Sequence, residues 1–508
     1  MLKKKNVFVL VVLFILLGII IMSTSCATKD TETGDSNKGD TRTEAIDGNE
    51  TESAENVETA KLQPNLGAAD FGGYVFRVLN RTTTSPDAID WIPRDVYAEA
   101  MNGETINDAV YKRNAYLEDK YNFKISQIFW DSAEITKYIA RIIQAGDDLF
   151  DVTYPNFANA PVLAQEGHFV NLHTIPNLDL SQPWWDQRAN ASLSIGGKLY
   201  FTSGDNAMVN KDACPAILFN KKLLAENELE NPYVLVRNNQ WTIGKLYDMC
   251  KGVAKDLNGD SKMNYTDDRY GFIGQRDSMT SFLHGAGELI AAKNTDDYPV
   301  ITFAERAFKA MEGCFDLMYD QDVSHNAHHL EGIVPAIYEV SEKMFMEDRA
   351  LFMWCRLRIV ENLRSMETDF GILPIPKLDS AQTKWGHTVN RYVGVPMCVP
   401  ITNKNLERTG HILEAICAES KYTTIPAYYD VALKTKFARD AESEVMLDII
   451  FNSTVYDVGE IYNFGNFGYD LIFMCMKNDR NLASMFDKYL PKMEKDIEKV
   501  IEKYGELN

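Results

Sequence analysis

The loop from Asp256 to Asp267 has the spacing of a calcium-binding loop. Oxygen-bearing side chains occupy its positions 1, 3, 5, 9 and 12, and position 7 can donate a backbone carbonyl. A hard cation that takes about six to eight oxygen ligands fits such a loop. Ser261 replaces the usual glycine and Asp267 the usual glutamate, so an Asx-rich turn without metal is the alternative. We expect a structural Ca²⁺ that orders the loop, held by Asp256, Asn258, Asp260, Lys262, Asn264 and Asp267.

The sequence lacks the common motifs of catalytic sites. The sequence has no GxSxG elbow, no HExxH pair and no P-loop. His325, His328 and His329 have a spacing that can reach a metal, but we expect them to be surface side chains near a helix end. The paired carboxylates of a glycosidase leave no sequence signature, so that class stays open.

Tryptophans give a second chemical signal. Sugars present flat C–H patches and a rim of hydroxyls, so a sugar site needs aromatic faces with polar groups around them. Any single tryptophan can instead serve packing, but several together predict one or two ligand contacts. Six of them lie in polar or loop-like surroundings: Trp91, Trp184, Trp185, Trp241, Trp354 and Trp385.

The first 26 residues read as a signal peptide. Lys3 to Lys5 precede an apolar run from Val7 to Met22, and small residues then lead to Cys26. This run of 16 residues is shorter than the roughly 20 that a membrane-spanning helix needs. The ending resembles a bacterial lipobox, with Ser23 where leucine is usual, and plain secretion or an uncleaved anchor is the alternative. We expect acylation of Cys26 and attachment to the extracellular face of a bacterial cell membrane.

Composition divides the rest of the chain. Residues 27–70 are polar and poor in large apolar side chains, which predicts a disordered stalk. The remaining chain of about 435 residues exceeds one hydrophobic core, so we expect two lobes. A net charge of −21 argues against nucleic acid as a partner. The seven cysteines after Cys26 are scattered and form no CxxC pair, so neither disulfides nor a zinc cluster are indicated.

Strands and helices alternate in the first part of the body. Tyr74–Leu79, Phe123–Phe129 and Phe150–Tyr154 read as strands, and amphipathic helices separate them. This alternation predicts parallel βαβ units and an open, doubly wound α/β sheet. Ligands bind beyond the carboxyl ends of such strands, which makes Tyr154, Asn156 and Asn159 candidate contacts. The alternative is that they only shape a turn.

The chain resembles the extracellular solute-binding proteins of family 1, the maltose-binding-like lipoproteins of ABC transporters, over most of residues 73–508. No segment is diagnostic alone, but their order and spacing together are fairly specific. The segments are Gly103–Asn114, Gly197–Tyr200, Phe219–Leu223, Asn231–Tyr233 with Trp241–Thr242, Asp369–Lys377, Arg439–Asp440 with Glu444–Met446, and Tyr456–Asp457.

The resemblance implies two α/β lobes, each an open and mostly parallel sheet flanked by helices, that close on a ligand about hinge strands. Crossovers are expected near Leu199–Gly204 and Val395–Pro400. The implied N-terminal lobe is 71–199 with a return at 397–435, and the implied C-terminal lobe is 200–396 with terminal helices at 436–508.

The resemblance also suggests ligand contacts. Trp354 matches a family tryptophan that stacks on sugar, and Tyr154 to Asn159 match a ligand-contacting loop. Pro155, Asn156 and Ala158 stand where the best-known sugar binders of the family have a tryptophan and charged residues. Position in the cleft adds Asp205 and Asn206. The remaining candidate contacts are Trp185, Trp241 and Arg356.

The expected function is that of a monomeric, non-enzymatic binding protein that passes a carbohydrate, such as an oligosaccharide, to ABC permease subunits. An exported polysaccharide hydrolase and a ligand-sensing lipoprotein without a transporter are the alternatives. A hydrolase releases new reducing ends, whereas a binding protein keeps its ligand unchanged.

Overall fold

The computed structural model describes residues 61–82, 91–429 and 440–507. The predicted signal peptide, Cys26 and residues 27–60 of the predicted stalk lie outside the described residues. Within the described ranges, no helix combines the length and the apolar character that crossing a membrane requires.

Residues 61–70 belong to the folded body, so the stalk predicted for 27–70 was drawn too long. Lys61 Nζ forms an ion pair with Glu419 at 2.7 Å, and the Leu62 amide donates to Tyr422 Oη at 2.9 Å. Leu66 packs against the hydrophobic core. These two polar contacts and the packing of Leu66 hold the segment against the surface.

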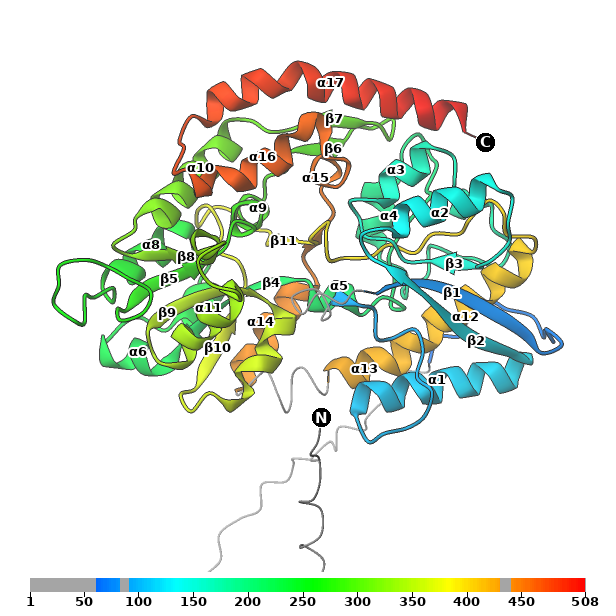
Figure 1. The fold of residues 1–508 in the computed structure, drawn as a ribbon, viewed down its shortest axis with the longest axis horizontal. Coiled ribbons are helices and arrows are strands. Elements are labelled where there is room, and N and C mark those ends of the chain that lie inside the picture. The colour runs from blue at the N-terminus through cyan, green and yellow to red at the C-terminus, as the bar shows by residue number, and fades with distance from the viewer. Residues whose placement is uncertain (1–60, 83–90, 430–439, 508) are drawn as a thin grey trace, which may run out of the picture. The chain divides into compact units, whose positions relative to one another are not determined.

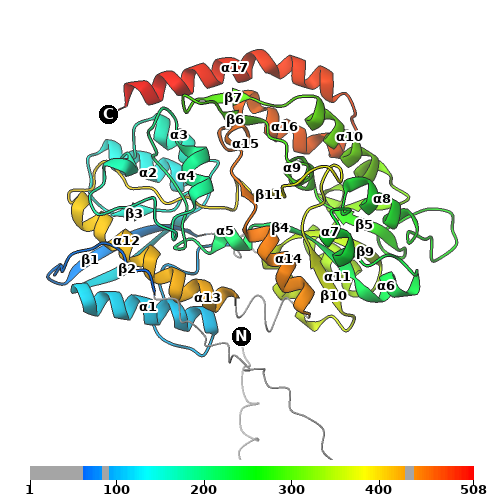
Figure 2. The same cartoon turned by 180° about the vertical axis from the view of Figure 1, so that it is seen from behind.

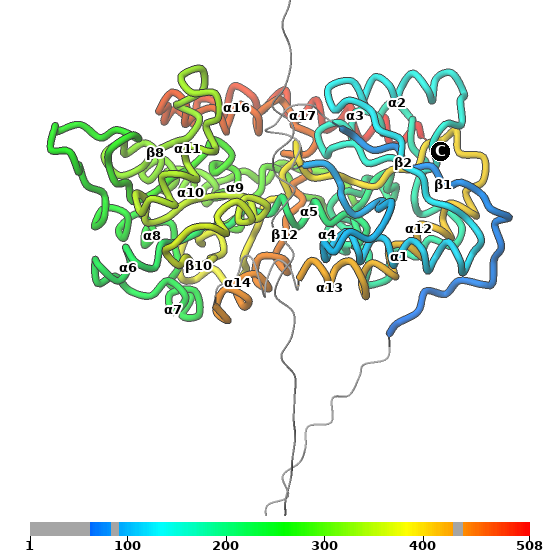
Figure 3. The backbone as a smooth tube through the Cα atoms, turned by 60° about the horizontal axis from the view of Figure 1, so that its bottom comes forward, coloured from blue at the N-terminus to red at the C-terminus, as the bar shows by residue number. Residues whose placement is uncertain are grey.

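The N-terminal lobe is built on a parallel sheet with strand order β2-β1-β3 (Figure 1). β1 (Tyr74–Thr82) pairs with β2 (Phe123–Asp131) along its whole length, and with β3 (Val152–Thr153) at Val78 and Leu79. The expected βαβ alternation is present, because α1 (Thr105–Tyr121) and α2 (Ile135–Gln144) connect these strands. Figure 3 shows α13 (Thr424–Tyr429) beside α1.

The C-terminal lobe contains a five-stranded mixed sheet with strand order β10-β4-β9-β5-β8. The pairs β5–β9 and β5–β8 are parallel, whereas β4 is antiparallel to both β9 and β10. Here the expectation of a mostly parallel sheet is only half right. β4 enters from the hinge and runs away from it, while β9 runs toward the hinge and ends opposite the start of β4. The strands are β4 (Pro215–Asn220), β5 (Tyr270–Gly274), β8 (Ser324–Asn326), β9 (Ala350–Arg356) and β10 (Phe370–Leu373).

Helices cover both sheets. With the first lobe lie α3 (Ala160–Gln165), α4 (Gln187–Leu193) and α12 (Leu406–Tyr422), and α5 (Val209–Asp212) lies between the lobes. The second lobe carries α6 (Lys221–Glu226), α7 (Pro232–Arg237), α8 (Ile243–Lys251), α9 (Ser278–Gly285), α10 (Glu305–Tyr319), α11 (Ile337–Met346), α14 (Ala441–Phe451), α15 (Val458–Tyr462) and α16 (Phe467–Phe473). Two small sheets complete it, formed by β6 (Ala291–Lys293) with β7 (Pro299–Ile301) and by β11 (His387–Thr388) with β12 (Thr454–Val455).

Two segments cross between the lobes side by side. Thr202 and Met397 exchange backbone hydrogen bonds with N···O distances of 3.3 and 2.7 Å. Cys398 pairs in the same way with Thr153 at the end of β3, at 2.9 and 3.0 Å. The stretches 199–204 and 395–400, where we expected the crossovers, therefore form one short ribbon that continues the edge of the N-terminal sheet. The connection from α13 to α14 runs through residues 430–439, which lie outside the described residues.

The last helix, α17 (Leu482–Glu506), reaches both lobes (Figure 2). Phe486 packs on Phe303 of the C-terminal lobe, with ring centres 5.3 Å apart. At the other end, Lys198 Nζ donates to the carbonyls of Tyr504 and Leu507, and the Tyr504 ring contacts Tyr200. The expected assignment of residues 436–508 to the C-terminal lobe alone is therefore wrong for the end of α17.

Trp184 and Trp185 fix the first crossing segment to α12. Their indole Nε1 atoms both donate to the buried carboxylate of Glu414, at 3.0 and 2.9 Å. Gly204 packs closely against Trp185 and Cys417. A Cβ atom at this position would lie 2.6 Å from Cys417 Sγ and 2.8 Å from the Trp185 ring. Only glycine fits this approach.

All seven cysteines after Cys26 are buried and free, as expected of small hydrophobic side chains.

Burial of Glu414 predicts a pH dependence of stability. Burial raises its pKa from 4.5 to about 7, although the two indole donors lower it in part. Between these values the folded state keeps a proton that the unfolded state has released, so stability falls as pH rises through this window. We expect Glu414→Gln to show a smaller loss of melting temperature between pH 5 and pH 8 than the parent.

The control is Glu407→Gln, a change at an exposed position on the same helix. An unchanged pH slope in Glu414→Gln would contradict the assignment. Part of the pH dependence of the melting temperature should persist in Glu414→Gln, because burial also raises the pKa of Glu460 to about 7.

Candidate ligand-binding cleft

The carboxyl ends of the strands of both lobes meet at one place. Arg81 lies near the end of β1, and Trp91 follows in the next described loop. From the other lobe, Gln275 and Asp277 follow β5, and Arg356 ends β9. This is the edge at which open α/β sheets bind ligands.

Arg356 lies between two tryptophans at this edge. Its guanidinium carbon is 5.3 Å from the ring centre of Trp91 and 5.6 Å from that of Trp354, distances at which a cation is attracted to an aromatic face. The guanidinium also forms an ion pair with Asp277. One side chain of the C-terminal lobe thus contacts an aromatic residue from each lobe.

A cavity of about 120 Å³ opens beside this group. Three of its lining residues carry a buried polar atom to which no described residue offers a hydrogen bond: Trp354 Nε1, Arg356 Nε and Gln275 Oε1. Buried polar groups are almost always paired in folded proteins, so three of them around one cavity indicate a polar ligand or water. The cavity is lined by Trp91, Gln275, Tyr338, Glu339, Ser341, Glu342, Met353, Trp354, Cys355, Arg356, Ile359 and Asn362.

Arg81 holds the segment that crosses the floor of the cleft. It donates to the carbonyls of Trp91 at 2.7 Å and Tyr392 at 3.0 Å, and also to that of Val393. Asn156 donates to the Tyr392 carbonyl as well, at 3.3 Å. Burial lowers the pKa of Arg81 to about 10, which still leaves it charged at neutral pH. The dipoles of these three backbone carbonyls stabilise its positive charge.

The histidine cluster is not on the surface, contrary to expectation. His328 is buried because the turn after β8 lies against α11, and His325 is buried beside Tyr265 and Tyr270. His328 Nδ1 accepts from the Arg276 amide at 3.3 Å, and Tyr338 Oη lies 3.3 Å from Nε2. Burial lowers the pKa of both histidines to about 4. Across the described ranges, no three His, Cys, Asp or Glu side chains come together as a metal-binding group.

The expected ligand contacts separate into several groups. Trp354 and Arg356 line the cleft cavity. Asn156 contacts the cleft floor, and the Asn159 amide closes a turn onto the Asn156 side chain at 3.0 Å. Tyr154 is buried and accepts from Asn206 Nδ2 at 3.0 Å, so these two support the hinge.

Trp241 was expected at the ligand and is a core residue instead. It is 0% exposed, packs on Phe352 and donates from Nε1 to the Pro374 carbonyl at 2.8 Å. Its loop-like sequence context hid this role, because the residues that bury it come from distant strands.

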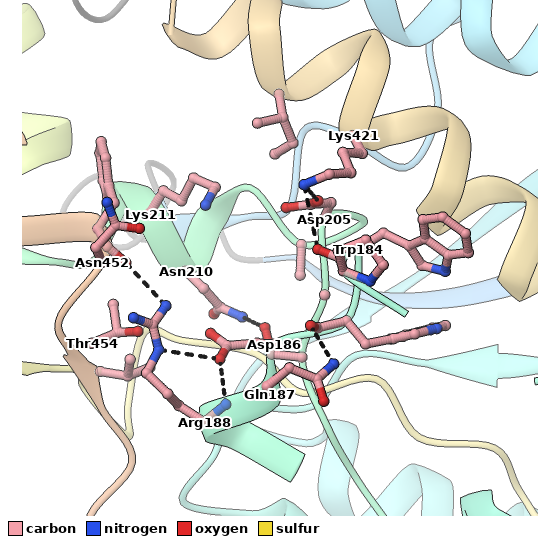
Figure 4. A pocket seen from close by; sticks show the side chains of 18 of the residues that line it. Trp184, Asp186, Gln187, Arg188, Asp205, Asn210, Lys211, Lys421, Asn452 and Thr454 are labelled. Carbon is pink, nitrogen blue, oxygen red and sulfur yellow. Dashed lines mark hydrogen bonds and ion pairs between the residues drawn. The ribbon is translucent and has the colours of Figure 1, made fainter. Parts of the chain in front are cut away.

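Trp185 and Asp205 line a different and larger cavity, of about 580 Å³ (Figure 4). This hinge cavity lies between α4, α12 and α13 on one side and the end of α14 with β12 on the other. Trp185 presents little surface to it, because Glu414 and Gly204 bury the ring.

Sequence reasoning missed Gln275, Asp277 and Tyr338. The first two directly follow a strand that is rich in apolar and aromatic residues, Tyr270–Gly274, so the rule that pointed to Tyr154 could have found them. Tyr338 comes from α11, and no sequence signal brings it to the cleft.

The expected calcium loop has the turns that such loops use. The Asp256 carboxylate accepts from the amides of Gly259 and Ser261, both at 2.7 Å, and these residues have φ angles of 77° and 66°. Ser261 therefore adopts the backbone conformation of the usual glycine. The Asp267 carboxylate instead accepts from Thr266 Oγ1 at 2.6 Å.

Comparison with known proteins identifies the fold. No family model and no curated protein sequence matches this chain. Solved structures do match it over most of its length. A cyclo/maltodextrin-binding protein complexed with maltotetraose has a TM-score of 0.55 and 12% identity, covering 85% of this chain and 98% of its own. The fold is that of the two-lobed solute-binding proteins.

Further matches have the same two-lobed solute-binding fold. A maltose-binding MalE from Listeria monocytogenes in complex with maltose has a TM-score of 0.54 and 14% identity, covering 84% of this chain and 98% of its own. An ABC substrate-binding protein from the same organism, in complex with cycloalternan, has a TM-score of 0.51 and 12% identity, covering 85% and 99%. At these identities the likeness concerns the fold alone.

Proposed function

We propose that this chain is the solute-binding component of an ABC importer and captures an oligosaccharide between its lobes. The observation that carries the proposal is the cleft cavity, which lies beside two indole rings and is lined by Trp354, Arg356 and Gln275, each with an unpaired polar atom. Aromatic faces with hydrogen-bonding groups at their rim are what a sugar requires. The matched structures are complexes with maltose, maltotetraose and cycloalternan, which supports the same class of ligand.

Capture by closure follows from the position of the cavity. Trp91 belongs to the N-terminal lobe and the other lining residues to the C-terminal lobe. A ligand that contacts both would favour the closed form, and a permease can recognise that form.

Calorimetry against a panel of oligosaccharides tests the proposal. We expect at least one saturable glycan ligand, whose affinity falls about tenfold or more in Trp354→Ala and in Arg356→Gln, since each removes a ring face or a charged donor. Trp241→Phe is the matched control: it should lower the melting temperature through lost core packing and leave affinity unchanged.

Two outcomes would contradict this function. Binding of peptides or polyamines without any glycan would exclude the carbohydrate assignment. Release of new reducing ends from a bound glycan would identify a hydrolase.

We further propose that Cys26 is acylated and keeps the protein at the extracellular face of the membrane, where a permease could receive its ligand. Mass spectrometry of the mature N-terminal peptide should find Cys26 as the first residue, carrying acyl chains. A mature chain that retains residues 1–25, or that begins after Cys26, would show that the lipid anchor is wrong.

Calcium in the loop 256–267 remains a proposal as well. Asp256, Asn258, Asp260, Asn264 and Asp267 would supply side-chain oxygens and Lys262 its carbonyl, provided that Asp267 turns away from Thr266. Because a bound ion stabilises only the folded state, chelation should lower the melting temperature. Asp260→Ala should melt at the lower temperature with and without chelator. Equal responses to chelator in Asp260→Ala and the parent would rule out this site.

A further inference from the structure

The hinge cavity lies on the opposite side of the crossing segment from the cleft cavity. Asp205 and Lys211 line the hinge cavity, whereas Asn206 and Asp212 do not. Asn206 donates to Tyr154 Oη at 3.0 Å, and Asp212 pairs with Arg94 at 3.2 Å. The two cavities share no lining residue. The segment from 205 to 212 therefore separates two distinct spaces between the lobes.

Both lobes supply walls of the hinge cavity (Figure 4). Tyr456 Oη donates to Asp186 Oδ2 at 2.9 Å, and Arg188 Nη2 donates to the Phe451 carbonyl at 3.1 Å. Tyr429 packs on Phe451 with ring centres 5.4 Å apart. Its volume of about 580 Å³ is within the range of small-molecule sites.

The two carboxylates in this cavity differ in how well they are paired. The Asp186 carboxylate is engaged, because it accepts from the amides of Arg188 and Ala189 at 3.0 and 3.3 Å and from Tyr456. Among the described residues, Asp205 forms one ion pair, with Lys421 at 4.0 Å. Burial raises the pKa of Asp205, although the charges of Lys211 and Lys421 lower it in part. Its negative charge is therefore poorly stabilised.

Lys211 has no acidic partner within ion-pair distance among the described residues. Its ammonium lies 5.4 Å from the centre of the Phe451 ring. Arg188 forms an ion pair with Asp186 and donates to the Phe451 carbonyl. Lys421 donates to the Pro183 carbonyl at 3.4 Å. Three cations thus face two carboxylates in a protein whose net charge is −21.

We infer that the hinge cavity is a second binding site, for a small organic anion whose acidic group pairs with Lys211. The cavity is larger than an inorganic ion needs, and the Tyr429 and Phe451 rings provide apolar surface for a carbon skeleton. Arg188 and Lys421 add positive charge around the same space. This site is separate from the sugar cleft and does not depend on the proposed transport function.

An occupied hinge cavity should oppose closure of the sugar cleft. The two spaces lie on opposite sides of the crossing segment, so a rotation that closes one opens the other. An anion that contacts both walls of the hinge cavity therefore holds the cleft open, and linkage requires that each ligand weakens the other. This consequence, unlike the site itself, rests on the proposed function.

The test is calorimetric titration of the protein without sugar, with D-glucuronate, citrate and inorganic phosphate, and with glucose as the neutral control. We expect saturable binding of glucuronate or citrate and none of glucose. Lys211→Gln should weaken the anion about tenfold by removing its charged partner, whereas Asp205→Asn should strengthen it by removing a repelling charge. The exposed-surface control Lys124→Gln should change nothing.

Opposite responses of two variants that each remove one charge cannot arise from unfolding alone. The site is refuted if none of the organic anions saturates, if phosphate binds and they do not, or if all variants bind alike. Loss of anion binding in Arg356→Gln, with Lys211→Gln unaffected, would place the anion in the sugar cleft and equally overturn the inference. A sugar affinity that is indifferent to bound anion would refute the coupling and leave the site standing.

Discussion

The pairing of Thr202 with Met397 is the constraint on which the rest of the molecule depends. Two backbone hydrogen bonds join the crossing segments, and Cys398 extends the ribbon to the last strand of the N-terminal sheet. A ribbon anchored in this way allows the lobes to rotate about it but not to separate. It also brings the carboxyl ends of both sheets to the same place, where Trp91, Trp354 and Arg356 meet.

The surroundings of the ribbon explain several buried polar groups that would otherwise be costly. Glu414 receives two indole donors, and the Trp184 carbonyl accepts from the Asp205 amide, so α12 is tied to the end of the first crossing segment. Asn210 donates to Ser203 Oγ at 2.7 Å and to the Val395 carbonyl at 2.9 Å, which links both crossing segments. Because polar groups in a hinge must remain paired as it bends, such short and local hydrogen bonds are suitable there. Among the buried polar atoms that have no partner in the described residues, those of Trp354, Arg356 and Gln275 belong to side chains that line the cleft cavity.

The sequence predicted the features that depend on local pattern. Alternating strands and helices indicated the N-terminal sheet, and the rule that ligands bind at strand ends indicated the neighbourhood of Tyr154 and Asn156. It could not give strand direction in the other lobe, because β4 is antiparallel only as a consequence of where the hinge delivers it. Trp241 and Trp185 were misjudged for a related reason: polar sequence neighbours do not reveal burial by Phe352 or Glu414, which are distant in the chain. The apolar stripe of α17 showed that it packs, but not that it reaches Lys198 of the other lobe.

The central claim is that the sugar is held at the edge where the strands end and not in the larger hinge cavity. A crystal structure with a bound oligosaccharide tests it most directly. The account predicts a sugar ring on the face of Trp354, hydrogen-bonded to Arg356 or Gln275 and contacted by Trp91 from the opposite lobe. A sugar bound instead against Tyr429, Lys211 and Asp205, with the cleft beside Trp354 empty, would contradict it.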